Sequence, residues 1–363
     1  MKKPGLLIGL MLLVFLAWGL GIKRTEPRPK TGSRQETLAA KIKLPESPSL
    51  GPLDLNRIFQ EDHSWTATLP AERKRTLIIT GDVMLGRTVN RLVIQKQNFS
   101  WPWEKVAPFL QSADLTLVNL ESPLLAACPV ISGGFKFCGD ARQAEGLAAA
   151  GIDIAGLSNN HAGNFGEAGI KETAEVLAAK DILTVRDNKP TFRKINNLLF
   201  TFLAYDDTIA SVSAERVREG IAAARPDAGV VIILFHWGRE YTDQPDSRQI
   251  KLAHLAIDAG ADLVAGSHPH WIQSLEVYRG KLIVYSLGNF IFDQEWSLPT
   301  KQGIAGRFTF YQQQLADAQF YPLIIENYGQ PRFLQGGERR VILDSLASKS
   351  AKLAEDMNTF DKP

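Results

Sequence analysis

Short apolar runs recur along the chain, separated by segments with helical spacing. The runs at 75–82, 113–120, 152–157, 198–204, 229–235, 262–265 and 281–286 are rich in β-branched residues and leucine and predict strands. The segments 141–150, 166–179, 214–224 and 247–259 predict helices. Nearly continuous apolar strands that alternate with helices predict an α/β fold with buried strands. Later runs at 307–313, 319–326 and 332–334 predict an antiparallel edge or a second sheet.

Polar side chains follow the ends of these predicted strands. Ligands of open α/β sheets bind outside the carboxyl ends of the strands, so we expect these side chains to share one site. Carboxylate, amide oxygen and imidazole together are ligands for divalent metals, and we expect one or two ions of Mn, Zn, Fe or Mg. The residues concerned are Asp82, Glu121, Asn160, His161, His236, His268 and His270.

The sequence His268-Pro269-His270 is an informative part of this pattern. Proline blocks a helical ladder, so we expect both rings on an extended turn, where residues i and i+2 share a face. Gly266 is expected to let the backbone turn sharply before them. Each element alone has a simpler explanation: Gly81-Asp82 as a turn, the loop 159–161 as a helix cap, and His236 as a core histidine. Their coincidence at strand ends favours the metal site.

The amino terminus differs from the rest of the chain. Lys2 and Lys3 precede an uncharged run over residues 5–22, which as a helix is roughly 27 Å long, close to the thickness of a bilayer core. We expect an uncleaved signal anchor over residues 1–24 that makes the chain a single-pass protein of the cell membrane. A cleaved signal peptide, which would give a secreted protein, and a buried core helix are the alternatives. Long domains are translocated largely regardless of flanking charge, so we expect the domain outside the cytoplasm.

The next segment, residues 25–72, is polar and expected to be a proline-rich linker. An ordered wrap around the domain is the alternative, for which residues 53–65 are suited. The main domain is expected over residues 73–345, followed by a polar tail over residues 346–363. The prolines of the linker are Pro27, Pro29, Pro45, Pro48, Pro52 and Pro70.

Composition and charge narrow the classes of function. With 45% apolar and 22% charged residues, the chain has the composition of a globular protein. Lysine and arginine number 41 against 39 acidic residues, so the formal charge of +2 lacks the excess typical of nucleic-acid binding. Cys128 and Cys138 are too few for a four-cysteine zinc ribbon. With an export segment present we expect them to form a disulfide, and two free thiols are the alternative.

Six blocks of the sequence closely resemble the CapA family of bacterial capsule and poly-γ-glutamate synthesis proteins. The resemblance runs from about residue 76 to 294. It implies a branch of the calcineurin-like metallophosphoesterase superfamily, with a four-layer α/β/β/α sandwich and a two-metal centre. The blocks are GDVMLGR (81–87), NLESPL (119–124), LSNNHAGNFGEAGI (157–170), FHWGREY (235–241), GSHPHWIQ (266–273) and YSLGNFIFDQ (285–294).

The resemblance implies a role for each residue that matches a family motif. His161 matches the histidine that contacts substrate and protonates the leaving group. Asp82 matches the first metal-binding aspartate, Glu121 a bridging carboxylate, Asn160 an asparagine ligand, and His236, His268 and His270 the three later histidine ligands.

Two departures from the superfamily pattern change the implied ligand set. Met84 stands where a ligand histidine is usual, and Asn119-Leu120-Glu121 replaces a Gly-Asp-x-x-Asp block. One metal site would then have Asp82, Glu121 and His270, and the other Glu121, Asn160, His236 and His268. Asn164 replaces the usual CapA aspartate and is not an expected ligand.

Three further residues are candidates for contact with the substrate. Arg87 follows Asp82 closely and is expected to hold an anionic oxygen in a catalytic role, with a surface arginine as the alternative. Asn159 and Asn289 are expected to bind substrate at the pocket wall.

The predicted function is that of a membrane-anchored extracytoplasmic protein of capsule or poly-γ-glutamate synthesis or export. Its expected partners are the membrane, polymer synthase subunits and an anionic polymer or phosphoester. The site is expected to be of metal-dependent hydrolase type, with attack by metal-activated hydroxide and His161 as general acid. The alternatives are a secreted metal-dependent phosphoesterase on small phosphoesters and a non-catalytic accessory subunit of a polymer synthase.

Overall fold

The structure is a computed structural model that describes residues 50–360. The expected anchor over residues 1–24, and the expected linker as far as residue 49, lie outside the described residues. Within the described range, no helix is both long and apolar enough to cross a membrane. The anchor therefore stays a prediction.

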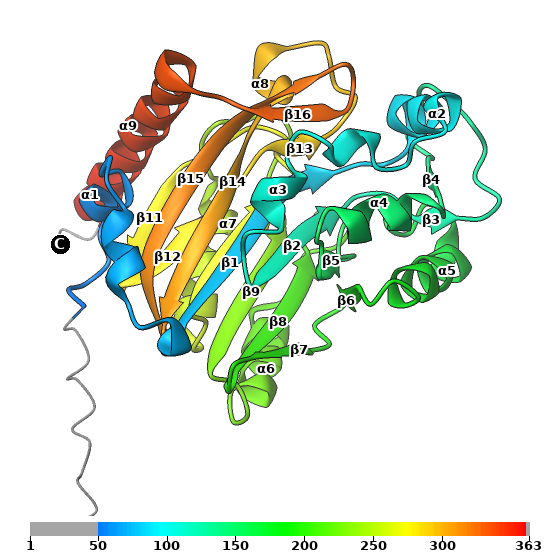
Figure 1. Cartoon of the computed structure of the whole chain (residues 1–363). Coiled ribbons are helices and arrows are strands. Elements are labelled where there is room, and N and C mark those ends of the chain that lie inside the picture. The colour runs from blue at the N-terminus through cyan, green and yellow to red at the C-terminus, as the bar shows by residue number, and fades with distance from the viewer. Residues whose placement is uncertain (1–49, 361–363) are drawn as a thin grey trace, which may run out of the picture. The chain divides into compact units, whose positions relative to one another are not determined.

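The larger sheet combines a parallel half with an antiparallel half (Figure 1). In spatial order its strands are β16 (Gln330–Phe333), β15 (Gln314–Glu326), β14 (Gln302–Tyr311), β1 (Lys74–Val83), β2 (Leu115–Leu120), β5 (Ile154–Gly156) and β6 (Leu183–Val185). β13 (Asn289–Ile291) pairs with β1 off this path. Strands β1, β2, β5 and β6 are parallel, and β14 to β16 are antiparallel. The late strands expected from the sequence thus form one side of this sheet.

The smaller main sheet has a parallel centre and an antiparallel strand at each edge. In spatial order its strands are β11 (Leu275–Tyr278), β12 (Lys281–Val284), β10 (Leu263–Ser267), β9 (Val230–His236), β8 (Leu198–Asp206) and β7 (Thr191–Ile195). A separate two-stranded parallel pair joins β3 (Leu124–Leu125) and β4 (Gly139–Asp140). Together with the helices, these sheets confirm the predicted mixed α/β class.

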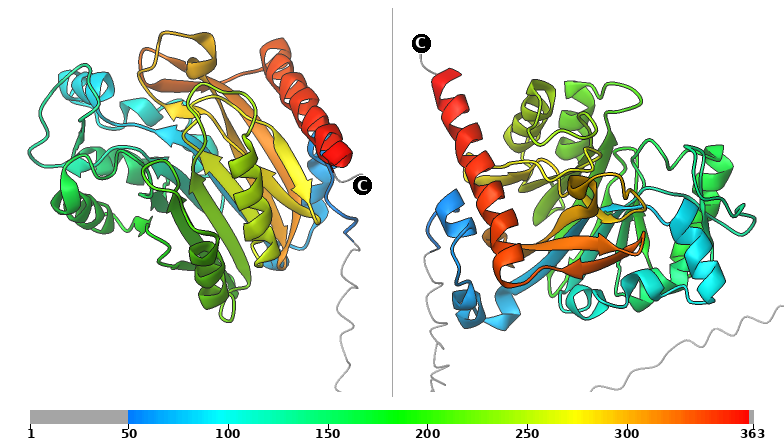
Figure 2. Two further views of the ribbon diagram at one scale, coloured as in Figure 1. Left: turned by 180° about the vertical axis from the view of Figure 1, so that it is seen from behind. Right: turned by 90° about the horizontal axis from the view of Figure 1, so that it is seen from above.

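The helices lie around the outside of the sheets (Figure 2). Several begin at polar residues that cap their first turn; Asp246, for example, makes a reciprocal capping box with Gln249. The helices are α1 (Leu55–Ile58), α2 (Arg87–Lys96), α3 (Ala107–Leu110), α4 (Gln143–Ala149), α5 (Gly166–Ala178), α6 (Ala214–Ala224), α7 (Ser247–Asp258), α8 (Leu298–Lys301) and α9 (Gly336–Phe360). Short 3₁₀ turns occur at η1 (Ser64–Thr68), η2 (Ala71–Arg73) and η3 (Trp101–Trp103).

The two main sheets pack face to face, with helices on their outer faces. Alternate residues of β1 serve different cores, because successive side chains of a strand point to opposite faces. Leu77 joins the core between the sheets with Phe200 of β8, whereas Ile78 joins the core beneath α4. Helices α6 and α7 cover the outer face of the smaller sheet and form a third core.

Two segments that were expected to lie outside the domain are packed onto it. Leu53, Ile58 and Leu69 are buried, so this part of the expected linker is the ordered wrap that the sequence left as an alternative. The expected polar tail from residue 346 is wrong as far as residue 360, since it belongs to α9. Leu346 and Leu353 lie on one face of this helix and are buried, and α9 runs beside α1 (Figure 1).

Candidate metal centre

Two groups of metal-ligating side chains meet where the central strands end. One consists of Asp82, Glu121 and His270, and the other of Glu121, His236 and His268. Within each group the ligand atoms all lie within 4.8 Å of one another, and every member is buried. Glu121 belongs to both groups. The structure therefore brings together five of the six predicted metal ligands around one shared carboxylate.

Strand register explains why these residues meet. In the larger sheet Asp82 of β1 lies opposite Asn119 of β2, and Glu121 follows Asn119 directly after β2. In the smaller sheet His236 of β9 lies opposite Ser267 of β10, just before His268. Parallel strands end at a common edge, so each sheet carries its ligands to the same end of the domain.

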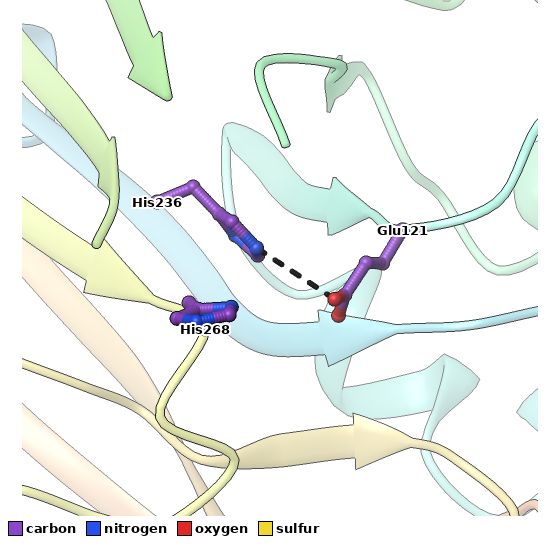
Figure 3. A group of neighbouring side chains, drawn as sticks. All are labelled: Glu121, His236 and His268. Carbon is purple, nitrogen blue, oxygen red and sulfur yellow. Dashed lines mark ion pairs between the residues drawn. The ribbon is translucent and has the colours of Figure 1, made fainter. Parts of the chain in front are cut away.

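The Glu121 carboxylate is the strongest sign that a cation belongs here. Both of its oxygens are buried and lack a hydrogen-bond partner. Burial, together with the nearby Asp82 carboxylate, raises the pKa of Glu121 well above its ordinary value. Unpartnered buried carboxylate oxygens are costly, and a bound cation removes that cost. Figure 3 shows Glu121 facing the imidazoles of His236 and His268.

Asn160, the sixth predicted ligand, also contacts the second group. Its Oδ1 lies 2.9 Å from His236 Nε2, and Glu121 Oε1 lies 3.6 Å from the same nitrogen. Atoms bound to one ion at about 2.0–2.2 Å lie about 3–3.6 Å apart at tetrahedral or octahedral angles. Buried His268 Nδ1 has no hydrogen-bond partner. The donor set of Glu121, Asn160, His236 and His268 thus fits a divalent metal.

Two polar side chains, those of Ser267 and Asn119, contact Nδ1 of His236. The Ser267 hydroxyl donates to the carbonyl of Phe235 at 3.2 Å, and its oxygen lies 3.0 Å from His236 Nδ1. The Asn119 amide nitrogen lies 3.3 Å from the same Nδ1, so Nδ1 accepts from Asn119 in one tautomer and donates to Ser267 in the other. With its proton on Nε2, the ring donates to Asn160 Oδ1 at 2.9 Å. A metal held by Nε2 would require the other tautomer, in which Nδ1 carries the proton and donates to Ser267.

Asp82 and His270 of the first group are held together by hydrogen bonds. His270 Nδ1 lies 3.0 Å from Asp82 Oδ2 and 2.9 Å from Asn289 Oδ1, so it donates to oxygens and leaves Nε2 for an ion. Asn119 donates to the other Asp82 oxygen at 2.8 Å. Burial alone would lower the pKa of His270, but the Glu121 and Asp82 carboxylates outweigh it and raise the pKa to about 9.

The histidines of the second group are shifted in the opposite direction. Burial and the neighbouring charge of His270 lower the pKa of His268 to about 4. Burial and the nearby histidines also lower the pKa of His236 well below its ordinary value. Both rings are therefore neutral at neutral pH, which is the form that binds metals.

The His-Pro-His turn differs from the sequence-based expectation. His268 has φ of 94° and His270 has φ of 58°, so the turn is left-handed at both histidines and is not extended. The ring centroids of His268 and His270 are 6.0 Å apart, and the two rings consequently belong to different metal-ligating groups. The expectation of a sharp turn at Gly266 is wrong, because Gly266 lies within β10 and pairs with Phe235 of β9. Glycine is required there for space: an added Cβ would lie 2.0 Å from the Tyr285 carbonyl oxygen.

Asn159 and Asn289 do not have the surroundings expected of residues that bind substrate at a pocket wall. Both side chains are buried, and all their amide groups are used inside the protein. Asn289 holds His270 and donates to Gln294 and to the Thr300 carbonyl. Asn159 donates to Asn119 and Leu120, and its oxygen accepts from the backbone of residues 161 and 162. They position the residues around the site and have no group left for a substrate.

His161 and Arg87 lie side by side at the edge of the centre. The ring of His161 packs on Phe137 with centroids 4.5 Å apart, and its Nδ1 has no hydrogen-bond partner. Burial lowers the pKa of His161, opposed by a hydrogen bond with Asn164. Arg87 is 11% exposed and pairs with Asp293, and its guanidinium carbon lies 4.9 Å from the centroid of Phe137. The alternative interpretation of Arg87 as a surface arginine is therefore wrong, and its positive charge is paired with the Asp293 carboxylate.

Met84 does not supply the missing histidine ligand. Its side chain is fully buried, and its sulfur accepts a hydrogen bond from the Gly86 backbone at 3.0 Å. The first group therefore keeps the three ligands that the sequence predicted for it. Cys128 and Cys138 form the expected disulfide, with Cα atoms 5.8 Å apart.

Sequence reasoning missed the residues that hold the ligands in place. Ser267 directly precedes His268 and Asn119 stands two residues before Glu121, so both could have been proposed from their place in the motifs. Asp293 lies in the block 285–294 but far from Arg87 in sequence, and Phe137 is distant from His161, so no local signal linked these pairs. Asn164 was set aside as a non-ligand, yet it contacts His161.

Comparison with known proteins places this chain in a family. Residues 76–294 match the family model described as "Bacterial capsule synthesis protein PGA_cap", and the chain belongs to that family. "Capsule biosynthesis protein CapA" of Bacillus anthracis is 29% identical over 287 residues, which cover 71% of this chain and 69% of the relative.

Two further relatives carry related descriptions. "PGA biosynthesis protein CapA" of Bacillus subtilis (strain 168) is 29% identical over 245 residues, which cover 60% of this chain and 63% of the relative. "Probable polyglutamine synthesis accessory protein" of Mycobacterium tuberculosis is 27% identical over 271 residues, covering 64% of this chain and 68% of the relative. The matched segments thus span about two thirds of the relatives' length.

Proposed function

We propose that this protein acts in capsule or poly-γ-glutamate synthesis or export through a metal-dependent hydrolase site. The observation that carries the proposal is Glu121, a buried carboxylate with two unpartnered oxygens that is shared by two groups of metal ligands. The names of the relatives supply the biological context, capsule and polyglutamate synthesis. The layered α/β arrangement and the ligand set support a metallophosphoesterase-like centre.

The chain's own residues would divide the work as follows. Glu121, Asn160, His236 and His268 would hold one metal ion, and Asp82, Glu121 and His270 a second. A divalent metal in such a site polarises the scissile group and lowers the pKa of water to about 7. His161 would give a proton to the leaving group, since its ring lies beside the ligand Asn160 and keeps one nitrogen unpartnered. Arg87 would orient an anionic oxygen of the substrate.

We further propose that the domain works outside the cytoplasm, tethered to the cell membrane by residues 1–24. The Cys128–Cys138 disulfide supports this location, because disulfides persist mainly in oxidising compartments. The substrate would be an anionic polymer or a phosphoester, and subunits of a polymer synthase would be partners.

One observation favours a second candidate, a non-catalytic accessory subunit. Met84 is buried and leaves the first group with three protein ligands. A weak first site would leave a single tightly bound ion, with a structural role in polymer assembly.

Metal content and hydrolysis measured on one preparation test the proposal. The full-length protein would be analysed by plasma mass spectrometry and assayed on an aryl phosphodiester, an aryl phosphomonoester and poly-γ-glutamate with Mn²⁺, Zn²⁺ or Mg²⁺. We expect His161→Ala to lower kcat about 100-fold or more with metal retained, and His268→Ala to lose metal and activity.

A histidine outside the centre provides the control. His254 pairs with Glu276 on the smaller sheet, and His254→Gln should keep both metal and turnover. Bound metal without turnover of any of the three substrates in the wild type would contradict the hydrolase and support the accessory subunit. Equal loss of metal in His161→Ala and His268→Ala would contradict the assignment of His161 as general acid.

A further inference from the structure

The loop over residues 126–138 connects β3 to β4 and returns to its starting point. Because β3 and β4 pair with each other, the two ends of the loop lie together. The disulfide between Cys128 and Cys138 closes it a second time. Arg87 Nη1 lies 3.5 Å from the Gly134 carbonyl, and Thr88 donates to the Ser132 carbonyl at 3.4 Å. These contacts hold the loop against the start of α2, beside the metal centre.

Two phenylalanines of this loop have opposite environments. Phe137, next to Cys138, is 1% exposed, and its ring contacts His161 on one side and Arg87 on another. Phe135 is 85% exposed and has its side chain in solvent. The loop therefore directs one aromatic ring into the site and the other away from it.

The same loop also holds Asn164, the residue that makes the second contact of His161. Asn164 Nδ2 donates to the backbone carbonyls of Phe135 at 3.2 Å and Phe137 at 3.1 Å. With its donors committed to the loop, Asn164 offers its oxygen to the hydrogen bond with His161. The ring of His161 is thus packed against one loop residue and hydrogen-bonded to a side chain that the loop holds.

We propose that the disulfide-closed loop is the positioning device of His161, with Phe137 as the positioning residue. This proposal deepens the proposed function and rests on it for the role of His161 in proton transfer. The loop does not contribute a metal ligand: none of its residues belongs to either metal-ligating group of the described chain. Loosening the loop should therefore impair proton transfer and leave the metal in place. A misplacement of about 1 Å can cost about 100-fold in rate, so a mobile ring loses rate while binding persists.

The test compares two substitutions of the same kind in the same loop. Phe137→Leu removes the ring from His161, and Phe135→Leu is the matched control in solvent. We expect Phe137→Leu to lower kcat about tenfold with KM and metal content within twofold of the wild type. Phe135→Leu should match the wild type in all three. The double variant Cys128→Ser/Cys138→Ser, which keeps Phe137 but opens the loop, should lower kcat in the same way.

A second measurement is independent of turnover. Hydrogen exchange of the full-length protein, read by mass spectrometry, should be at least about fivefold faster over residues 159–165 in Phe137→Leu and in the double cysteine variant than in Phe135→Leu. Equal exchange in Phe137→Leu and Phe135→Leu would overturn the proposal, as would equal kcat. If the wild type hydrolyses none of the substrates, the proposed function fails, and the exchange data still decide whether the loop holds His161.

Discussion

The two metal-ligating groups differ in the hydrogen bonds that their own side chains make. In the first, His270 donates to Asp82 and Asn289, and its pKa is raised to about 9 by the surrounding carboxylates. In the second, His268 is neutral, with its pKa lowered to about 4, and its Nδ1 has no partner. In the first group Asp82 and His270 satisfy each other, whereas in the second His268 Nδ1 and the shared Glu121 carboxylate have no hydrogen-bond partner.

This difference separates the stability of the metal-free protein from its affinity for metal, two properties that usually change together. The first group should contribute to the stability of the metal-free protein, since a buried carboxylate and a charged imidazole satisfy each other there. The second group should contribute little to that stability and most of the metal affinity. Glu121 belongs to both groups, so its replacement should have the largest effect.

Glu121→Gln should abolish metal binding and lower hydrolysis at least about 1,000-fold, because both groups lose their shared charge. In EDTA, however, the variant should melt at the same temperature as the wild type or higher. The amide fills the same space without a buried, unpartnered charge. Thermal unfolding with and without Mn²⁺ measures both effects, and the metal-induced rise in Tm should disappear.

Glu276→Gln is the matched control for that substitution. Glu276 is also a buried glutamate, but it accepts hydrogen bonds from His254 and Tyr285 away from the centre. Its replacement should lower stability in EDTA and leave metal binding unchanged. Should Glu121→Gln instead destabilise the metal-free protein as Glu276→Gln does, Glu121 would have a partner in the folded chain and the cation site would be in doubt.

A direct comparison of His270→Ala with His268→Ala should separate the two groups. In EDTA, His270→Ala should lower the free energy of unfolding by about 3–5 kcal/mol, since it leaves Asp82 buried without its charged partner. His268→Ala removes a neutral ring with a free nitrogen and should cost less. Denaturant unfolding in EDTA gives both values, and plasma mass spectrometry should show that His268→Ala has lost bound metal. Equal losses of stability would remove the distinction between the groups.

Much of the fold and the centre could be predicted because local sequence encodes them. Apolar runs such as 229–235 give buried strands with little ambiguity, and ligands directly after such runs are carried to a common edge by parallel pairing. The predictions that failed, the linker and the polar tail, concern residues whose burial depends on partners distant in the sequence. Leu53 and Leu346 are buried because the segments around α1 and α9 pack against the sheets and against each other.

The orientation of polar side chains was beyond sequence for the same reason. Asn289 was expected at the pocket wall, but its amide is taken up by His270, Gln294 and Thr300. The left-handed backbone at His268 and His270 reflects the distances between ligands from two different sheets. An asparagine that binds substrate and one that orients a ligand have the same sequence signal.

The smallest expected effect comes from Ser267→Ala, and it tests whether the surroundings of the second group favour metal binding. A metal held by His236 Nε2 requires the ring proton on Nδ1, and the Ser267 oxygen 3.0 Å away is the acceptor for that proton, which Ser267→Ala removes. Metal affinity should fall about tenfold, while the first group and the stability in EDTA change little. Ser274→Ala removes another buried hydroxyl, one that donates to Gln244, and should not change the affinity. Competitive metal titration of the two variants measures the difference, and equal affinities would mean that the contact between Ser267 and His236 does not support metal binding.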